Sequence, residues 1–553
     1  MNLDKWLLAK LAKNIGTIFK VYQLNKINIL WSNKRVQKDM PLTSIAELSY
    51  ITKDLSNKFY VGIDNSKVRN ALAEYYGGSG VGMNLGGVRC GNMLGYQVKG
   101  IGNNGLSSEK STFKHSNGSL SLLDAVSEAI YSEIINLISP VGANWVYGIV
   151  STGENSAYCD YSGKGINKLT KGALLMREAS FRPAHLMRNH SLMQESLKQF
   201  SIKDFERIKL LTGDLVKLIG QNNIDLMMKN CVASIAKQFS FTRAVRLCHG
   251  SMSPSNISIT GRWIDVGASS FISDCNNYIS SNNQVSFLDE PKEALNYIIE
   301  CENIINKNEN RKPNPQSIER FFWSEFNKYF AHSIVWTMGF DVNHHSNLTW
   351  DQLSVAREAD KFINKYGQAS RSDDYKFDKY FINIILPEYM KYISSRKSFL
   401  TEIVKEKQKN EVASEKYTIV NGFLRALKRN ILPSVIAKST LSPYISSEIY
   451  TSEEIGERIE EIFSFFKDIA NGFNTETINI IKTDKVDILF NATHYTFSVK
   501  EAHNTIHAET KIHEYLQREK IEIFGVDITK RIICMTKLIQ DFCLRIQSFD
   551  ERA

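Results

Sequence analysis

The sequence predicts an α+β fold with two lobes, followed by a largely helical C-terminal half. Three observations predict it. Residues 61–158 combine a glycine cluster, short apolar strands and one amphipathic helix, which is the plan of a small sheet-containing lobe. Residues 159–317 mix helices with a short hairpin, which indicates a second lobe. Residues 318–553 are expected to form a helical C-terminal region, because their apolar residues recur at spacings of three and four.

Length and composition limit the possible classes of protein. The chain has 553 residues, which is more than one hydrophobic core usually serves, so two or more domains are expected. A formal charge of +9 over this length suits a polyanionic ligand or an acidic partner, but it does not indicate nucleic-acid binding. The sequence has no run of about 18 apolar residues, so no transmembrane segment is expected. The eight cysteines include no CxxC pair, which predicts free thiols in a reducing cytoplasm.

Residues 1–60 are expected to form an N-terminal helical extension. The first segment, MNLDKWLLAKLAKNIGTIFKVY, is amphipathic, with its lysines away from the apolar face. Two interpretations stay open for it. The favoured one is a helix that docks on the body of the protein or on a partner. The alternative is a helix that lies on a membrane surface.

A glycine-rich stretch, YYGGSGVGMNLGGVRCGNMLGYQVKG, occupies residues 75–100. Eight of the chain's 31 glycines fall between residues 77 and 95. Glycine lets backbone N–H groups approach phosphate closely, because no Cβ intervenes. No GKS or GKT follows, so this is not a P-loop, and the stretch leads into a strand that carries Lys99. A glycine loop followed by a lysine strand is typical of protein kinases, and a ligand-free glycine hairpin is the alternative.

Lys99 has a candidate partner on the helix predicted near 119–138. In kinases, a helix glutamate holds the ammonium of the strand lysine towards the phosphates, and Glu128 has the right place for this role. Glu133 is the rival acid on the same helix. A surface ion pair that contributes little is the alternative interpretation.

Two further segments carry residues suited to phosphate and metal. MREASFRPAH, at 176–185, supplies Arg177 and Arg182, whose planar guanidinium groups suit phosphate. HGSMSPSNISITGRWIDVG contains Asn256 and Asp265, nine residues apart, around a turn at Thr260–Gly261. A hairpin there would bring both side chains to one end, where they could share one Mg²⁺. A hairpin without a ligand is the alternative.

In this order the motifs resemble one family, the SelO-type protein adenylyltransferases, which are pseudokinase-like enzymes that transfer AMP from ATP to protein hydroxyls. YGGSGVG with NLGGVR, VKGIG, SEAIYSE, IVSTGE, REASFRPAH and HGSMSPSNISITGRWIDVG each resemble a segment of that family, over about residues 75–271. The resemblance implies a protein-kinase-like two-lobed fold that uses ATP and Mg²⁺, with Mn²⁺ as the alternative metal. It assigns catalysis to Lys99, Glu128, Arg182 and Asp265, nucleotide binding to Gly77, Gly78, Gly80, Gly82, Arg89, Lys99, Arg177 and Arg182, and metal binding to Asn256 and Asp265.

One departure from the family bears on the reaction. The family has an aspartate directly before the metal-binding asparagine, where it acts as a base, and this chain has Ser255. A hydroxyl acceptor benefits from a general base, whereas a carboxylate, with a pKa of about 4, is already ionised. The loss of the base therefore fits either a carboxylate acceptor, which would give an acyl-adenylate, or a protein that binds nucleotide without chemistry.

The sequence thus predicts an ATP- and Mg²⁺-dependent adenylyltransferase that acts on a peptide or protein. One possible acceptor is a C-terminal carboxylate activated during peptide maturation, as in siderophore-bearing microcins. A first alternative is a nucleotide-binding pseudoenzyme whose helical C-terminal half binds a partner enzyme. A second alternative is a phosphotransferase, because the same metal ligands can serve the α- or the γ-phosphate.

Overall fold

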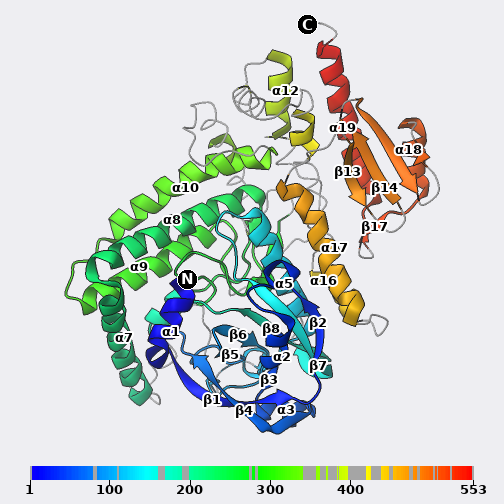
Figure 1. Ribbon diagram of the computed structural model, residues 1–553. Coiled ribbons are helices and arrows are strands. Elements are labelled where there is room, and N and C mark those ends of the chain that lie inside the picture. Colours follow the sequence, from blue (N-terminus) through cyan, green and yellow to red (C-terminus); the bar gives the residue numbers. More distant parts are fainter. Residues whose placement is uncertain are drawn as a thin grey trace.

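The computed structural model of the chain shows a sheet-containing lobe, a helical lobe and a smaller C-terminal unit (Figure 1). The structure describes residues 3–78, 84–108, 111, 113–159, 168–189, 198–272, 277–280, 284–339, 357–361, 369–370, 383, 385–395, 401, 419–424, 438–446, 452–471, 477–482, 486–492, 494–501, 505–506, 509–523 and 526–550.

The first lobe is built on an eight-stranded antiparallel sheet in the order β2-β7-β8-β6-β5-β4-β1-β3. Helix α5 packs against β7 and β8, and the Ser121 hydroxyl caps it by accepting the Asp124 N–H at 3.1 Å. The helix predicted near 119–138 and the strand predicted to carry Lys99 are therefore confirmed. The elements are β1 (Gly16–Leu24), β2 (Asn28–Ser32), β3 (Tyr50–Ile51), β4 (Ile63–Glu74), β5 (Cys90–Met93), β6 (Tyr96–Lys99), α4 (Phe113–Ser116), α5 (Leu122–Ile138), β7 (Val146–Cys159) and β8 (Lys168–Glu178).

The N-terminal segment corrects one prediction. Helix α1 (Leu3–Ile15) is the expected amphipathic helix, and it docks its apolar side chains on the body beside α7. However, β1, β2 and β3 also come from residues 1–60 and belong to the sheet, so this range is not a helical extension. GTIFKVYQL continues the apolar pattern of the helix, but it forms β1 and pairs with β4 over its whole length. Two short helices, α2 (Leu42–Glu47) and α3 (Lys53–Phe59), complete the segment.

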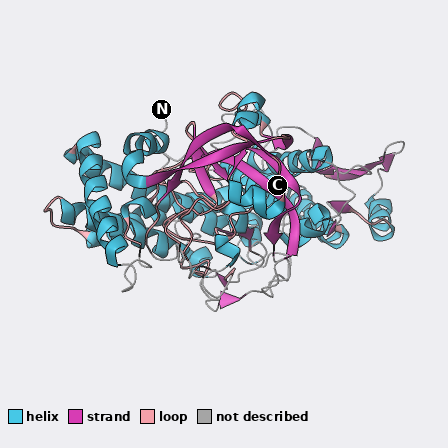
Figure 2. Ribbon diagram, turned by 90° about the horizontal axis from the view of Figure 1, so that it is seen from below, coloured by secondary structure: helices cyan, strands magenta, loops and turns pink. Residues whose placement is uncertain are grey.

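Most of the described part of the second lobe consists of the long helices α7, α8, α9 and α10. Figure 2 shows the strands of the large sheet lying against helices. One hydrophobic core continues from α1, α5, β7 and β8 into α8, α9 and α10, so the two lobes share packed side chains. Residues 309–314 connect α9 to α10. The elements are α6 (Pro183–Leu186), α7 (Lys198–Ile219), α8 (Gln221–Val245), β9 (Leu247–Cys248), η4 (Val266–Ala268), β10 (Ser270–Phe271), β11 (Asn277–Tyr278), α9 (Glu290–Asn308) and α10 (Pro315–Thr337).

The C-terminal half is largely helical, but the prediction of helices nearly throughout missed a four-stranded sheet, β13-β14-β15-β16. Buried and half-buried residues alternate along VDILFN, as in a strand, but residues 488–490 are all apolar, so the sequence does not show this alternation. The elements are β12 (Ala369–Ser370), α12 (Leu386–Ser395), α16 (Lys438–Ser446), α17 (Ser452–Asn471), β13 (Thr477–Lys482), β14 (Val486–Asn491), β15 (Thr496–Glu501), β16 (Thr505–Ile506), α18 (Glu509–Arg518), β17 (Glu522–Ile523), β18 (Val526–Asp527) and α19 (Thr529–Asp550).

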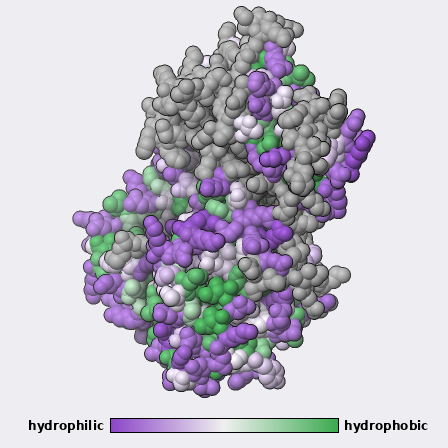
Figure 3. Space-filling view, turned by 45° about the vertical axis from the view of Figure 1, so that its right-hand side comes forward, coloured by the Kyte–Doolittle hydropathy of each residue, from purple (hydrophilic) through white to green (hydrophobic). Residues whose placement is uncertain are grey.

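In the part of the chain that the structure describes, no helix is both long enough and apolar enough to cross a bilayer. Most of the described residues on the face in Figure 3 are hydrophilic, and an apolar patch lies over the lower part of this face.

Candidate active site

Four charged side chains from distant parts of the chain meet where the two lobes join. Lys99 Nζ lies 2.6 Å from Glu128 Oε2 and also contacts the Asp265 carboxylate. Arg177 Nη1 contacts Glu128 and lies 2.7 Å from Asp265 Oδ1. Each carboxylate therefore contacts both cations. We call Lys99, Glu128, Arg177 and Asp265 the charged cluster.

The register of the sheet explains how this cluster forms. Strands β6 and β8 pair so that Gln97 stands opposite Arg177, and Gln97 lies on the same strand face as Lys99, two residues on. The Gln97 Oε1 atom accepts hydrogen bonds from Arg177 Nε at 2.9 Å, from Arg177 Nη2 at 2.6 Å and from Arg182 Nη2 at 2.9 Å. Gln97 is fully buried. One amide oxygen thus holds both arginines of the predicted phosphate segment.

Arg182 reaches from the sheet lobe to the hairpin. Its Nη1 donates to the main-chain carbonyl of Ser255 at 2.7 Å, and its guanidinium lies 5.0 Å from the centre of the Tyr76 ring. Glu74 lies 3.9 Å from Arg182 Nη2 and accepts from Gln97 Nε2 at 3.0 Å. Arg182 therefore positions the segment that contains Ser255, in addition to any contact that it makes with a phosphate.

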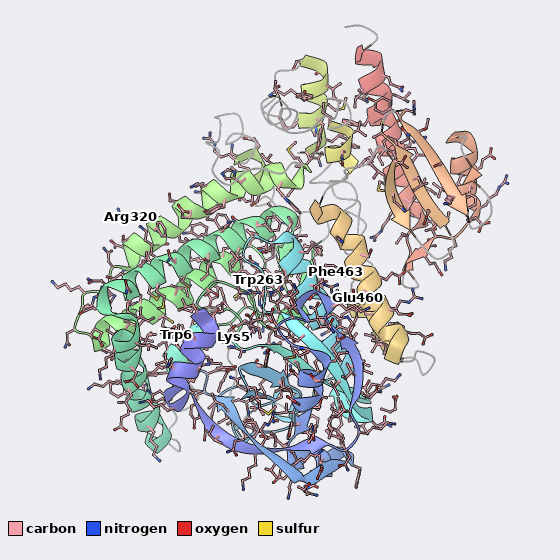
Figure 4. The ribbon with its side chains drawn as sticks, in the orientation of Figure 1. Lys5, Trp6, Trp263, Arg320, Glu460 and Phe463 are labelled. Carbon is pink, nitrogen blue, oxygen red and sulfur yellow. The ribbon has the colours of Figure 1, made fainter. Side chains whose placement is uncertain are left out.

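The predicted hairpin is confirmed, and it brings Asn256 and Asp265 to the same end. The Ile264 N–H donates to the Asn256 carbonyl at 2.8 Å, and Gly261 makes the turn with a φ of +84°. Asp265 itself has a φ of 58°, in the left-handed region. Trp263, labelled in Figure 4, anchors the hairpin in the core.

His249 holds the two arms of this hairpin together. Its Nε2 lies 3.0 Å from the Ile264 carbonyl and 3.2 Å from the Asn256 carbonyl. Burial lowers the pKa of His249 to about 4, although the carbonyl contacts oppose this shift, so the imidazole is neutral near pH 7. A neutral ring with a proton on Nε2 can donate to these carbonyls. His249 is thus a structural donor behind Asn256 and Asp265.

Ser255 and Asn256 are linked by their side chains. The Ser255 hydroxyl lies 3.2 Å from Asn256 Oδ1 and 2.9 Å from the Ser253 hydroxyl. Asn256 Nδ2 donates to the Ser251 carbonyl at 2.6 Å, which directs the Oδ1 atom away from that carbonyl. Ser255 therefore supplies a neutral hydroxyl where the family places a carboxylate.

The charges of the site favour the ionised form of Asp265. Burial alone would raise the pKa of Asp265, but the positive charges of Arg177, Lys99 and Arg182 hold it well below its usual value. Burial likewise opposes the charge on Arg177, but Asp265 and Glu128 hold its pKa well above the usual value. The Asp265 side chain keeps 26 % exposure, whereas the other members of the cluster are buried. Asp265 is therefore the acid in the cluster that a ligand can reach.

The predicted nucleotide-binding glycines are only partly described. The Gly77 N–H donates to the Ala184 carbonyl at 2.9 Å, and the Gly78 N–H donates to the Arg188 carbonyl at 2.9 Å. A Cβ on Gly77 would lie 2.1 Å from the Met187 carbonyl oxygen, so glycine permits this close approach. Gly80 and Gly82 lie outside the described residues.

Two other predicted residues lie at the margins of the site. Arg89 Nη1 lies 3.4 Å from the Ser119 carbonyl, near the start of α5. Glu133, the rival acid, does not contact Lys99 but accepts from Arg35 Nε at 2.5 Å, on another side of α5. Glu128 is therefore the acid that holds Lys99.

Sequence reasoning missed Gln97, which contacts both arginines, and Glu74, which contacts Arg182 and Gln97. The sequence indicates only that Gln97, two residues before Lys99, lies on the same face of the strand, and it does not indicate the contact with the two arginines. Glu74 stands directly before the glycine stretch. Burial would raise the pKa of Glu74, but Arg182 and His185 outweigh this effect and lower the pKa to about 2. No local pattern in the sequence indicates that partnership.

Asn256 and Asp265 are the residues that could hold a cation. Within the described ranges, no group of three or more His, Cys, Asp and Glu side chains is arranged to bind a metal ion. Mg²⁺ commonly uses one or two protein oxygens and completes its shell with phosphate oxygens and water, so these two residues fit that ion together with a nucleotide. A lysine held by a helix carboxylate beside such a hairpin resembles the class of site that protein kinases use for a metal-bound polyphosphate.

A comparison with known protein families agrees with this class. The family model for protein adenylyltransferase SelO matches residues 71–515. The chain therefore belongs to the SelO family, as the sequence motifs predicted. The match includes the whole charged cluster and extends past residue 271 into the C-terminal half, where no motif had been recognised. No curated protein matches the chain.

Proposed function

We propose that this protein is an ATP- and Mg²⁺-dependent adenylyltransferase that transfers AMP to a carboxylate of a peptide or protein. The observation that carries the proposal is the charged cluster itself, with an ionised, partly exposed Asp265 next to Asn256 on one hairpin. The family match supports adenylyl transfer as the class of reaction.

Each residue has a role that follows from its contacts. Lys99, held by Glu128, and Arg177 bind phosphate oxygens, while Asp265 and Asn256 hold Mg²⁺ or Mn²⁺. Asp265 contacts both Lys99 and Arg177. A bound triphosphate would replace Asp265 as the partner of these two cations. The metal ion, when bound, neutralises charge on the phosphates. Arg182 keeps the Ser255 segment in place.

The glycine stretch completes the nucleotide site in this proposal. Gly77 and Gly78 hold the start of the loop against residues 184–188. Gly80 and Gly82 are assigned to nucleotide binding by the family resemblance. Arg89 adds positive charge near the start of α5. The fold assigned to this arrangement is the protein-kinase-like one implied by the family.

Ser255 favours a carboxylate as the acceptor. A carboxylate oxygen attacks the α-phosphorus, a new O–P bond forms, and the bond from that phosphorus to the bridging oxygen breaks, releasing pyrophosphate. No proton has to leave the acceptor, so positioning and charge neutralisation suffice. A C-terminal carboxylate of a peptide under maturation, activated for ester or amide formation, fits this chemistry.

The test compares ATP labelled at the α-phosphate with ATP labelled at the γ-phosphate, using candidate peptide and protein acceptors. We expect label from the α-phosphate only, in a product that hydroxylamine releases, because an acyl-adenylate is a reactive mixed anhydride. Asp265→Ala should abolish the transfer. A hydroxylamine-stable product would refute the carboxylate acceptor, and label from the γ-phosphate would indicate a phosphotransferase.

One observation favours a second candidate function. Asp265 is bound by both Lys99 and Arg177, which is also what a protein that holds nucleotide without turnover could show. Such a pseudoenzyme would use the helical C-terminal half to bind a partner enzyme. Thermal stabilisation by ATP with no label transfer to any acceptor, and a partner activity lost in Lys99→Ala, would support it.

A further inference from the structure

Helix α17 from the C-terminal half lies across the sheet lobe. It packs against β2 and against α5, although it follows them by more than 300 residues in the chain. Figure 1 shows α17 running alongside α5 and the β2 edge of the sheet. The approach is close, since a Cβ on Gly456 would lie 2.9 Å from the Leu30 carbonyl oxygen.

Arg35 is the residue that joins these elements. Its Nε lies 2.5 Å from Glu133 Oε2 on α5, and its Nη1 lies 2.8 Å from Glu460 Oε2 on α17. Its guanidinium carbon lies 3.5 Å from the centre of the Phe463 ring, which also belongs to α17. Figure 4 labels Glu460 and Phe463 on the side of α17 that faces the sheet lobe. Planar arginine suits such a site, because it can bind two carboxylates and stack on a ring at once.

Two further contacts reinforce the junction. Trp31 Nε1 donates to Glu460 Oε1 at 3.0 Å, so Glu460 binds two side chains from the N-terminal segment. Lys438 of α16 contacts Asp124 at the start of α5. Helix α5 is therefore contacted by the C-terminal half near its N-terminus and again at Glu133.

The same helix carries Glu128 on the side that faces the charged cluster. Glu128 and Glu133 are five residues apart, and Glu128 holds Lys99 at 2.6 Å. Hydrogen-bond strength falls steeply with distance and angle, so a small shift of α5 weakens the hold on Lys99. A contact that fixes Glu133 consequently fixes the position of Glu128.

We propose that Arg35 is a positioning residue, which couples α17 to α5 and thereby keeps Glu128 in contact with Lys99. Arg35 and Trp31 lie before residue 71, outside the family match, whereas Glu133 and Glu460 lie within it. The N-terminal segment thus supplies a connection between two parts of the family region. The effect on activity rests on the proposed function, but the effect on α5 does not.

The test uses Arg35→Ala, Glu460→Ala and the double variant, with Glu461→Ala as the matched control. Glu461 is the adjacent acid on α17, and its ion pair is with Arg458 on the same helix. Hydrogen–deuterium exchange of the α5 amides gives a readout that needs no activity, and titration with ATP and Mg²⁺ gives the nucleotide affinity. Arg35→Lys keeps the positive charge but lacks the planar guanidinium, and it replaces Arg35→Ala in the test if that variant does not fold.

We expect faster exchange across residues 122–138 and an ATP affinity lowered about threefold to tenfold in both single variants. The ATP affinity of the double variant should lie within about twofold of that of the single variant with the lower affinity. Both single substitutions break the same Arg35–Glu460 contact, so their effects should not add. Unchanged exchange in α5, additive losses, or an equal effect in Glu461→Ala would overturn the proposal. If the parent protein transfers no AMP while α5 exchange still responds, the proposed function fails and the positioning role stands.

Discussion

Glu128→Gln is the most informative single substitution in the charged cluster. Glutamine has nearly the same shape as glutamate, so it changes the charge with little change in packing. The cluster has two cations and two carboxylates, and the substitution leaves Asp265 as the only carboxylate for both Lys99 and Arg177. In addition, the new amide N–H₂ group would face a cationic donor.

The size of the effect can be estimated from the contact. Two unit charges 2.6 Å apart attract by about 6 kcal/mol at an effective dielectric constant of about 20. Desolvation of the buried carboxylate offsets part of this, and breaking a buried pair typically costs about 3–5 kcal/mol. Because Asp265 still balances Lys99, we expect the lower end, about 3 kcal/mol, which is about a hundredfold in ATP affinity or turnover.

Calorimetric titration with ATP and Mg²⁺ measures the affinity, and transfer from α-labelled ATP measures the turnover. Glu461→Gln makes the same chemical change on α17, away from the charged cluster, and should stay close to the parent. If Glu128→Gln keeps affinity and turnover within about twofold of the parent, then Lys99 does not depend on Glu128 and the reasoning is refuted.

Three other substitutions test separate parts of the site. Gln97→Leu should lower ATP affinity by about tenfold or more, because two buried arginines lose their shared acceptor, and an unchanged titration would contradict this. Gly77→Ala should lower the free energy of unfolding by about 2 kcal/mol or more, because the new Cβ would clash with the Met187 carbonyl oxygen. The melting temperature should then fall by several degrees, and an unchanged melting curve would contradict this prediction. Burial raises the pKa of Asp4 to about 7, although its hydrogen bond with Thr260 opposes the shift. The folded protein therefore binds more protons than the unfolded chain between about pH 4 and pH 7, and the contribution of Asp4 to the free energy of unfolding falls as pH rises through that window. Denaturant unfolding should accordingly show that the free energy of unfolding of Asp4→Asn rises relative to that of the parent as pH rises. A difference in unfolding free energy that does not change with pH would exclude this role of Asp4.

The sequence predicted the charged cluster because its members stand in motifs with a fixed order. Lys99, Glu128 and the hairpin with Asp265 each follow from local chemistry, and the fold brings these three residues together. The predicted helix at 119–138 and the hairpin at Thr260–Gly261 are equally local signals, since a serine cap and a turn glycine determine them.

Long-range contacts could not be predicted in the same way. Nothing near Gln97 indicates that its side chain joins two arginines about 80 residues later in the chain, because this depends on the register of β6 with β8. The junction of Arg35 with Glu460 spans 425 residues and depends on where α17 packs. The strands in residues 1–60 were missed because an amphipathic helix and a pairing strand share apolar residues over short windows.

Titration of ATP, with and without Mg²⁺, into the parent protein and into Lys99→Ala and Asp265→Asn tests the central claim most directly, because it needs no acceptor. The account predicts Mg²⁺-dependent binding by the parent and an affinity lowered at least about tenfold in both variants. Ser255→Ala should bind like the parent. Equal affinity in all four proteins, or binding that does not respond to Mg²⁺, would contradict the assignment of the charged cluster and its hairpin as the metal–nucleotide site.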